Sequence, residues 1–342
     1  MVSSPFAQKA STSTTPNHVI AMVWAPDENR TTMYAHFLRA PIFNIHYLLY
    51  KRPFVAPLKY IAQAFKTWWV LLQQRPKYIY ITNPPVFAPL CVFVYCKLSG
   101  ARYVMDTHSP ALFSRKWGWT LPLQRFLAKH AYVNVVDQVR FKEQFESWGA
   151  KAIILEKPPR DTDSETFQYV GNPDEFSVAV VNTFAVDEPV DIIVEAARRL
   201  PDVHFYITGA TERANPDDLK DVPPNVTFTG YLKGKDYWNR LYSSRAVMAL
   251  TTYPYSLLAG AQDGADMKKP LILSRQPALE EYFNIGAVFA ENTADGLVAA
   301  TQQIIADEEQ LKTDIIQLAR TQAEHWRQNF QMLKQMMEIR ES

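Results

Sequence analysis

Short apolar runs alternate with helix-like segments along the chain, in two series separated by a polar break. In the first series, six runs have the length and the two-sided apolar character of strands buried in a parallel sheet. The predicted strands are residues 19–25, 44–50, 78–82, 102–106, 131–136 and 152–156. Helical patterns lie between them at residues 56–74, 85–98, 120–129 and 138–148. The alternation predicts a parallel sheet covered by helices.

The polar break, residues 157–176, is rich in proline and charged residues and predicts an interdomain segment. The pattern of strands and helices then restarts. Strands are predicted at 177–183, 204–208, 226–230, 246–250, 270–274 and 287–290, with helices near 188–200, 235–244 and 257–267. The fold class is therefore α/β, with two Rossmann-like domains of similar size.

The tail, from about residue 306 to 340, has apolar residues three or four positions apart, which predicts one amphipathic helix with a buried stripe. The stripe comprises Leu311, Ile315, Leu318, Trp326, Phe330, Leu333 and Met337. We expect this helix to cross back onto the first domain. The expected divisions are a disordered lead-in at 1–17, a first domain at 18–160, a linker at 161–176, a second domain at 177–305 and the helix at 306–342.

Composition and missing motifs narrow the class of protein. The chain has 342 residues, of which 47% are apolar and 21% charged, as in a folded soluble protein. Its two cysteines, Cys91 and Cys96, exclude a disulfide framework and favour a reducing, cytoplasmic location. The glycine motifs of dinucleotide and P-loop enzymes are absent, as are HExxH and GxSxG. The longest apolar stretch, residues 84–96, is too short to span a bilayer.

The net charge of +1 conceals two halves of opposite charge. Residues 1–160 hold 20 Lys and Arg against 7 Asp and Glu, whereas the remainder is acidic. A basic half favours an anionic partner. We expect no nucleic acid, because no recognised nucleic-acid-binding motif accompanies the charge. In residues 50–78, cations such as Lys59 and Lys66 are mixed with Trp68 and Trp69. Two interpretations stay open: a helix on an anionic membrane surface, or buried tryptophans with a solvated basic face.

Ligands of open α/β sheets bind beyond the carboxyl ends of the strands. In the second domain these positions are the loops at 182–188, 209–215, 230–236 and 251–260. The last loop holds Ser256 and opens a helix, whose N-terminus is suited to a diphosphate. Asp263 lies within that helix, where a carboxylate accepts hydrogen bonds from ribose hydroxyls. A solvated helix surface is the alternative for Asp263 alone.

Three stretches together resemble a known family. Residues 260–297 (GAQDGADMKKPLILS…ENTADGL) resemble the donor region of GT-B glycosyltransferases of the family-4, "group 1" kind. Residues 225–252 and 82–109 are similar to their F-x-G-Y-L block and to their N-P-P…G-A-R-Y-V-x-D-x-H region. The resemblance spans roughly residues 77–300. It implies two domains facing a cleft, with an acceptor-side first domain and a donor-side second domain.

The resemblance also implies roles for individual residues. Asp263 takes the place of the motif's second Glu and would hold the donor ribose. The other donor-side residues would be Asn182, Thr183, Gly209, Arg213, Tyr231, Leu232, Ser256 and Leu257, with Tyr231 and Leu232 at the nucleobase and Ser256 and Leu257 at the diphosphate. Asp106 and His108 would face the acceptor, where either could take the acceptor hydroxyl's proton.

Departures from the family pattern bear on activity. Tyr255 stands where the motif's first Glu is expected, and residues 182–190 lack the usual Arg and Lys. Phosphate charge would then fall to Arg213, Lys233 or Arg30. These departures leave a catalytically degenerate subunit that binds a partner enzyme as the alternative function.

The expected function is a hexosyltransferase of polysaccharide biosynthesis that moves a sugar from a UDP- or GDP-linked donor. No metal and no other cofactor is expected, because backbone N–H groups and cations would stabilise the leaving diphosphate. The expected acceptor is a saccharide or a lipid pyrophosphate. The expected location is cytoplasmic and peripheral on the inner face of the membrane.

Overall fold

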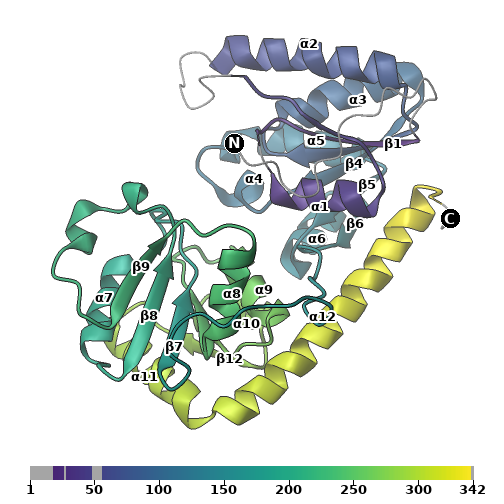
Figure 1. The fold of residues 1–342 in the computed structure, drawn as a ribbon. Coiled ribbons are helices and arrows are strands. Elements are labelled where there is room, and N and C mark those ends of the chain that lie inside the picture. The colour runs from purple at the N-terminus through teal and green to yellow at the C-terminus, as the bar shows by residue number, and fades with distance from the viewer. Residues whose placement is uncertain (1–17, 27, 48–55, 340–342) are drawn as a thin grey trace. The chain divides into compact units, whose positions relative to one another are not determined.

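The computed structural model describes residues 18–26, 28–47 and 56–339, so the expected lead-in at 1–17 lies outside the described residues. The chain divides into two units (Figure 1). Unit 1 comprises the residues up to Pro158 together with those from Trp326 onward, and unit 2 comprises Pro159–His325.

Unit 1 is built on a six-stranded sheet in which every strand pair is parallel, in the order β2-β1-β3-β4-β5-β6. Its strands are β1 (Val19–Val23), β2 (Ile42–Asn44), β3 (Tyr78–Asn83), β4 (Arg102–Thr107), β5 (Val133–Val136) and β6 (Ala152–Ile154). Every residue of β1, β3 and β5 is buried, because helices cover both faces of the sheet.

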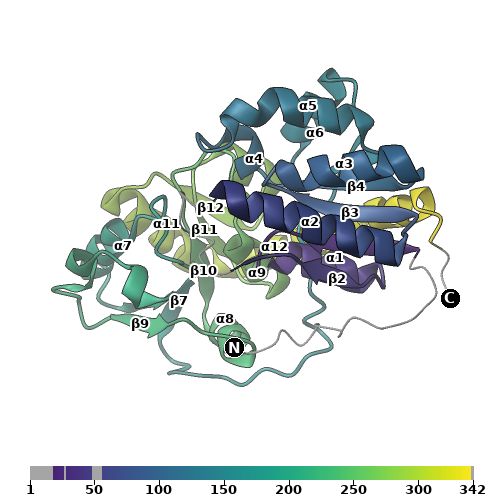
Figure 2. The same ribbon diagram turned by 90° about the horizontal axis from the view of Figure 1, so that it is seen from above.

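The helices of unit 1 lie in two layers. They are α1 (Asn29–Phe37), α2 (Ala56–Gln74), α3 (Phe87–Ser99), α4 (Pro110–Phe113), α5 (Leu121–His130) and α6 (Val139–Ser147). Figure 2 shows α2 and α3 side by side over β3 and β4, and α5 lies next to α3. On the other face, Tyr34 and Ala35 of α1 share a core with residues of β1, β3, β4 and β5.

Two expectations for unit 1 are corrected. The second strand is Ile42–Asn44 rather than 44–50, because Ala21, Met22 and Val23 of β1 pair with those three residues. Residues 45–47 are not in a strand, and 48–50 lie outside the described residues. The helix α1 had not been expected at all. It begins after Glu28, whose carboxylate accepts hydrogen bonds from the backbone N–H groups of Arg30 and Thr31.

Unit 2 repeats the architecture, with the parallel strand order β12-β11-β10-β7-β8-β9. Its strands are β7 (Phe176–Val180), β8 (Val203–Thr208), β9 (Val226–Gly230), β10 (Ala246–Ala249), β11 (Leu271–Ser274) and β12 (Ala287–Ala290). Its helices are α7 (Val190–Arg198), α8 (Lys235–Ser243), α9 (Ala259–Asp266), α10 (Pro277–Tyr282) and α11 (Ala294–Ala306), followed by α12 (Glu308–Met336).

Helix α12 contributes to the cores of both units. Ile315 and Leu318, in its first half, are buried in a core of unit 2. Trp326 and Phe330, in its second half, are buried in the core of unit 1 beside Tyr34. The polar segment ahead of β7 lies along unit 2, where Gln168 and Val170 donate backbone hydrogen bonds to side chains of α8.

Strand order places a topological switch point in each sheet. The connections run in opposite directions from β1 and β3 in unit 1, and from β7 and β10 in unit 2. Loops that leave neighbouring strands in opposite directions open a crevice at the carboxyl edge of such a sheet. The side chains at these two edges are therefore the candidates for contact with a ligand.

Candidate active site

A buried polar cluster lies at the carboxyl edge of the unit 1 sheet. Arg30, in the first turn of α1, lies 2.9 Å from Asp106 Oδ1, and its Nη2 also donates to the carbonyl oxygen of Leu155 at 2.7 Å. His108 Nε2 lies 3.5 Å from the other carboxylate oxygen of Asp106. The Asp106 side chain is fully buried, whereas that of His108 is 24% exposed. Of the two predicted acceptor-side residues, only His108 is therefore open to a ligand.

Opposite charges in this cluster shift the pKa values of Asp106 and His108 toward their ionised forms. Burial alone would raise the pKa of Asp106, but Arg30 and His108 outweigh burial and lower that pKa below its ordinary value. Burial alone would lower the pKa of His108, but Asp106 raises it above the ordinary value. Asp106 thus favours the protonated imidazolium that a general base becomes after it has taken a proton.

Two further carboxylates in the cluster were missed from the sequence. Asp137, which follows β5, lies 3.8 Å from Arg30 and accepts a hydrogen bond from the Ser109 hydroxyl at 2.9 Å. Burial raises the pKa of Glu156, which follows β6, to about 7. Asp137 follows the predicted strand 131–136 directly and Glu156 ends the predicted strand 152–156, so the rule that ligands bind at the carboxyl ends of strands could have found both.

Arg30, which the sequence suggested as a cation for the donor phosphates, already has partners within unit 1. Its guanidinium is 12% exposed and is already engaged by Asp106, Asp137 and the Leu155 carbonyl group. Its positive charge therefore offsets the negative charges of Asp106 and Asp137.

In unit 2, the loop after β7 is shaped by its own side chains. Asn182 is buried, and its side-chain oxygen accepts from Phe184 N at 2.7 Å. One carboxylate oxygen of Glu188 accepts from the N–H and hydroxyl groups of Thr183 and from Ala185 N, at 2.7, 3.0 and 3.0 Å. The donors of Thr183 and Ala185 thus form a small anion site, which the Glu188 carboxylate of the same loop occupies.

Gly209 allows the next loop to approach this one closely. Its φ is +122°, and a Cβ there would lie 2.6 Å from the carbonyl oxygen of Asn182 and 2.9 Å from the Phe184 ring. A larger residue would therefore separate the ends of β7 and β8.

A second network links the ends of β10, β11 and β12. The Thr251 hydroxyl donates to Asp187 at 2.5 Å, and Thr251 N donates to the Ser274 hydroxyl at 2.9 Å. Asn292 accepts from Ser274 at 2.7 Å and donates to the Thr251 carbonyl oxygen at 3.0 Å. Sequence reasoning named none of these four residues. They hold the switch-point loops in place.

Helix α9 begins at Ala259, so Ser256 lies before the helix and not in its first turn. Its N-cap is Leu258, with no side-chain cap, and Ser256 and Leu257 lie half-buried in the loop before it. Gly260 lets the first turn approach the loop after β7, because a Cβ there would lie 2.5 Å from a Val181 methyl carbon. The first-turn N–H groups of the helix thus start beside the β7 loop.

Asp263, the predicted ribose ligand, contacts a neighbouring helix. The Tyr237 hydroxyl of α8 donates to Asp263 Oδ2 at 2.7 Å. Burial, followed by the Asp263 charge, raises the pKa of Tyr237 well above its ordinary value, so the phenol stays protonated.

The remaining donor-side residues are more open. Tyr231, after β9, is 66% exposed, and the Lys233 ammonium group lies 5.2 Å from the centre of its ring. Leu232 is half-buried, and Arg213 is exposed at the end of a 3₁₀ helix, Thr211–Arg213. An exposed aromatic ring beside a cation is a suitable surface for a stacked base.

Two kinds of feature are missing from the part of the chain that the structure describes. No group of three or more His, Cys, Asp and Glu side chains that could hold a metal ion occurs there. None of the helices in the described ranges combines the length and apolarity required to cross a membrane.

Comparison with known proteins gives a match for part of the sequence and for the whole fold. Residues 191–337 match the sequence model of a family described as glycosyl transferase-like. No curated protein matches the sequence significantly.

Solved structures resemble the chain over nearly its full length. A sucrose-phosphate synthase from Thermosynechococcus elongatus has a TM-score of 0.73 and 13% identity, and the match covers 95% of this chain and 100% of that one. HepE from Anabaena, solved with UDP-glucose, has a TM-score of 0.68 and 12% identity over 93% and 99%. A trehalose-phosphate synthase from Burkholderia xenovorans has a TM-score of 0.65 and 11% identity over 93% and 100%.

These matches confirm the fold class that the sequence predicted, two Rossmann-like units of the GT-B kind. The chain therefore has the GT-B fold over nearly its whole length, and its residues 191–337 match the glycosyl transferase-like family model.

Proposed function

We propose that the chain transfers a hexosyl group from a nucleotide sugar to a saccharide or a lipid-linked saccharide. The observation that carries the proposal is the family match over residues 191–337, which includes every helix of unit 2 from α8 onward and nearly all of α7. The whole-chain GT-B fold supports it. In this proposal, unit 2 binds the donor and unit 1 serves the acceptor.

Uridine nucleotides are the first donors to test. HepE from Anabaena was solved with UDP-glucose, and a pneumococcal O-GlcNAc transferase of similar fold was solved with UDP and GlcNAc. GDP-linked sugars are the second choice. The nucleobase would stack on Tyr231, and Arg213 would lie at the phosphates.

The proposed reaction needs no bound metal ion. The bond between the sugar's anomeric carbon and the phosphate oxygen breaks, and the acceptor oxygen forms the new bond to that carbon. Backbone N–H groups at the start of α9 and nearby cations stabilise the leaving diphosphate. In an inverting transfer, His108 takes the acceptor hydroxyl's proton, and Asp106 stabilises the resulting imidazolium.

Turnover with a panel of UDP- and GDP-sugars tests the proposal. His108→Ala should lower turnover by roughly 10²–10⁴-fold, the usual contribution of a general base. His46→Ala, at an exposed histidine of the same unit, is the matched control and should leave turnover unchanged. Binding of a nucleotide sugar without turnover on any saccharide acceptor would favour the degenerate subunit instead.

Donor binding tests Asp263 separately. If Asp263 holds ribose hydroxyls, Asp263→Ala should weaken UDP binding by about 1–3 kcal/mol, because buried partners lose a hydrogen bond. Tyr237→Phe removes only the contact between the two helices. If Asp263 serves only that contact, both variants should lose stability by similar amounts and keep their UDP affinity.

We also propose that α2 docks on an anionic lipid bilayer, which would bring unit 1 to a lipid-linked acceptor. Large apolar side chains are exposed along α2 at intervals of three or four residues, as on one face of a helix. They are Leu58, Ile61, Phe65, Trp69 and Leu72. Trp68 instead packs edge-on against Tyr95. Exposed apolar stripes of this size mark interaction sites.

Charge around this stripe favours an anionic bilayer. Residues 56–131 contain ten Lys and Arg but a single acidic residue, Asp106, and Asp106 is buried. Each cation close to an anionic bilayer contributes about 1 kcal/mol. Lys59 and Lys66 lie on α2 itself.

Vesicle co-sedimentation tests the docking surface. Binding should appear with phosphatidylglycerol vesicles, decrease with salt, and decrease again in Lys59→Glu/Lys66→Glu and in Phe65→Ser/Trp69→Ser. The controls make the same changes elsewhere: Lys220→Glu/Lys312→Glu, and Val186→Ser at an exposed valine of unit 2. Equal binding to neutral and anionic vesicles would contradict the proposal.

A further inference from the structure

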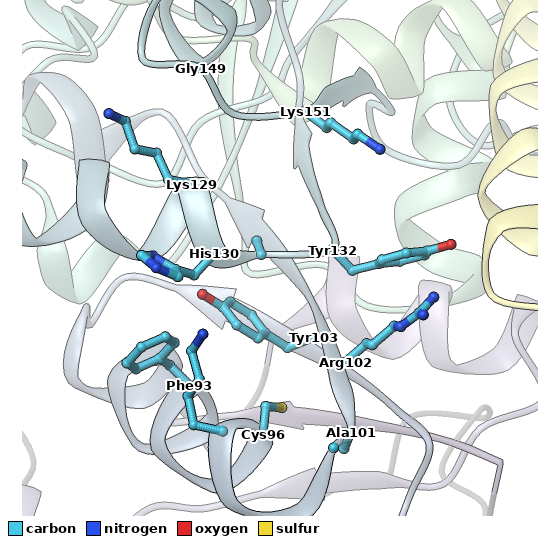
Figure 3. A pocket seen from close by; sticks show the side chains of 13 residues that line it. Phe93, Cys96, Ala101, Arg102, Tyr103, Lys129, His130, Tyr132, Gly149 and Lys151 are labelled. Atoms are coloured by element: carbon cyan, nitrogen blue, oxygen red, sulfur yellow. The ribbon is translucent and has the colours of Figure 1, made fainter.

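A basic hollow of about 440 Å³ lies in unit 1, at the amino edge of the sheet (Figure 3). It is lined by residues at the start of β4 and just before β5 and β6, by residues from the middle to the end of α3, and by the last residues of α5. Asp106, near the end of β4, and His108, just after it, lie at the opposite, carboxyl edge of the same sheet. The hollow is therefore separate from the candidate active site.

Cations dominate the lining of this hollow. Its four Lys and Arg residues are Lys97, Arg102, Lys129 and Lys151, and His130 adds an imidazole. No Asp or Glu is among the lining residues. Like charges gathered around a small space repel one another, and an anion placed between them relieves that repulsion.

Interaction with the C-terminal ends of helices accounts for only some of these cations. Lys97 and Lys129 lie in the last turns of α3 and α5, where cations complement the helix dipole. Arg102 and Lys151, by contrast, lie at the starts of strands. One carbonyl group near the end of each helix already accepts a backbone hydrogen bond: Gly100 N donates to Cys96 O at 3.0 Å, and Ala131 N donates to Leu127 O at 2.9 Å.

Nearby groups leave the cations available to a ligand. The Arg102 guanidinium stacks over the Tyr132 ring at 4.7 Å, a contact that leaves its N–H edge able to donate. Glu338 is close enough to interact with Arg102, but its carboxylate is held by Lys77 and by Tyr78 at 3.1 Å. His130 Nδ1 lies 2.8 Å from the carbonyl oxygen of Phe126, one turn earlier in α5.

Aromatic rings form the apolar part of the hollow. Phe93 and Tyr103 line it together with Tyr132. Gly100 and Gly149, both at positive φ, have no atoms within 4 Å of the position a Cβ would take. The cations therefore border an open, partly aromatic space rather than a packed interior.

We propose that this hollow binds a phosphate-bearing anion, and that this binding is additional to the proposed donor site. The guanidinium of Arg102 would bind phosphate oxygens in a two-pronged contact, and the lysines would supply point charges. The phosphate belongs either to a soluble anion or to a lipid headgroup, and the experiment separates these two sources.

Calorimetric titration of the full chain with inorganic pyrophosphate at low salt is the first arm. Lys129→Ala/Lys151→Ala should weaken one binding event by about tenfold or more, since a lost charge-assisted hydrogen bond costs at least that much. Lys142→Ala/Lys312→Ala makes the same charge change outside the hollow and should leave pyrophosphate binding unchanged. Lys129→Arg/Lys151→Arg should retain it. UDP affinity should be equal in all the variants, so failure of the donor site would be seen separately.

Phosphatidylglycerol and phosphatidylcholine vesicles are the second arm. A loss of binding to the anionic vesicles in Lys129→Ala/Lys151→Ala, relative to its control, identifies a lipid headgroup as the source. Unchanged vesicle binding together with weaker pyrophosphate binding identifies a soluble anion. If Lys129→Ala/Lys151→Ala and Lys142→Ala/Lys312→Ala bind pyrophosphate and both vesicles alike, the proposal is wrong.

Discussion

At the scale of single residues, the acid–base properties of unit 1 depend on Arg30. Without its charge, burial would favour a neutral Asp106, and a neutral Asp106 would no longer raise the pKa of His108. Arg30 contacts both Asp106 and Asp137, so its positive charge offsets the negative charges of both carboxylates. Two predictions follow at this scale.

The first concerns the pH dependence of transfer. A general base must be neutral, so turnover should fall as the pH decreases through the pKa of His108, which lies above that of an ordinary histidine. Asp106→Asn removes the charge that raises this pKa. The acid limb of the pH–rate profile should then move to lower pH. Circular dichroism would verify folding. An unmoved limb in a folded variant would exclude His108 as the titrating base.

The second concerns stability. Because the pKa of Glu156 is about 7 in the folded state, against 4.5 for an ordinary Glu, the folded protein retains its proton over a range in which the unfolded chain has lost it. Its contribution to stability therefore decreases as the pH rises from about 5 to 8. Glu156→Gln does not titrate. Its stability relative to the wild type should increase by roughly 2 kcal/mol between pH 5 and pH 8. Denaturant unfolding at both pH values would measure this, and a constant difference would argue against a buried, protonated Glu156.

At the scale of elements, close packing of α9 determines the geometry of the donor-side edge. A Cβ at Gly264 would lie 2.6 Å from a Leu271 methyl carbon and 2.9 Å from Val247 Cβ, so the helix lies almost directly on β10 and β11. Gly260, one turn earlier, makes the same kind of approach to Val181. These two glycines bring the helix N-terminus close to the β7 loop.

Substitution of Gly264 tests this packing. Gly264→Ala should destabilise unit 2 by about 1–2 kcal/mol, because overpacking outweighs the better helix propensity of alanine. Gly118→Ala is the control, since no atoms lie within 4 Å of a Cβ there, and its effect should stay within about 0.5 kcal/mol. Chemical denaturation compares the two. A stabilised Gly264→Ala variant would show that the neighbouring side chains move aside at little cost.

At the scale of the whole molecule, residues from the end of the chain complete the core formed by its beginning. The Trp326 ring stacks on Phe330 at 4.8 Å, and its indole N–H donates to the Tyr34 hydroxyl at 3.0 Å. Unit 1 is therefore formed from two segments separated by all of unit 2.

Truncation of Trp326 tests this arrangement. Trp326→Ala should destabilise unit 1 by about 3–5 kcal/mol through the cavity it leaves. Hydrogen exchange should accelerate in β1 and β3 but remain slow in β7 and β8. Trp119→Ala, at a tryptophan of unit 1 that is 69% exposed, should have little effect. Faster exchange in both units would mean that they unfold together.

The sequence by itself predicted the α/β class, two similar units and eleven of the twelve strands at nearly their observed positions, because buried parallel strands are continuous apolar runs. The rule that ligand loops follow strands selected the loops of unit 2, and the resemblance to GT-B glycosyltransferases added Asp106 and His108. The sequence did not predict α1: Asn29–Phe37 is a short helix with two threonines and little apolar periodicity, and Glu28 caps it. Tertiary structure alone decided which predicted groups were already engaged. Arg30 forms an ion pair with Asp106, and Tyr237 donates a hydrogen bond to Asp263. Both pairs are so far apart in the sequence that no local sequence pattern indicates them. The basic hollow likewise arises because a sheet edge brings together cations from residues 97 to 151, and only the folded chain places them around one space.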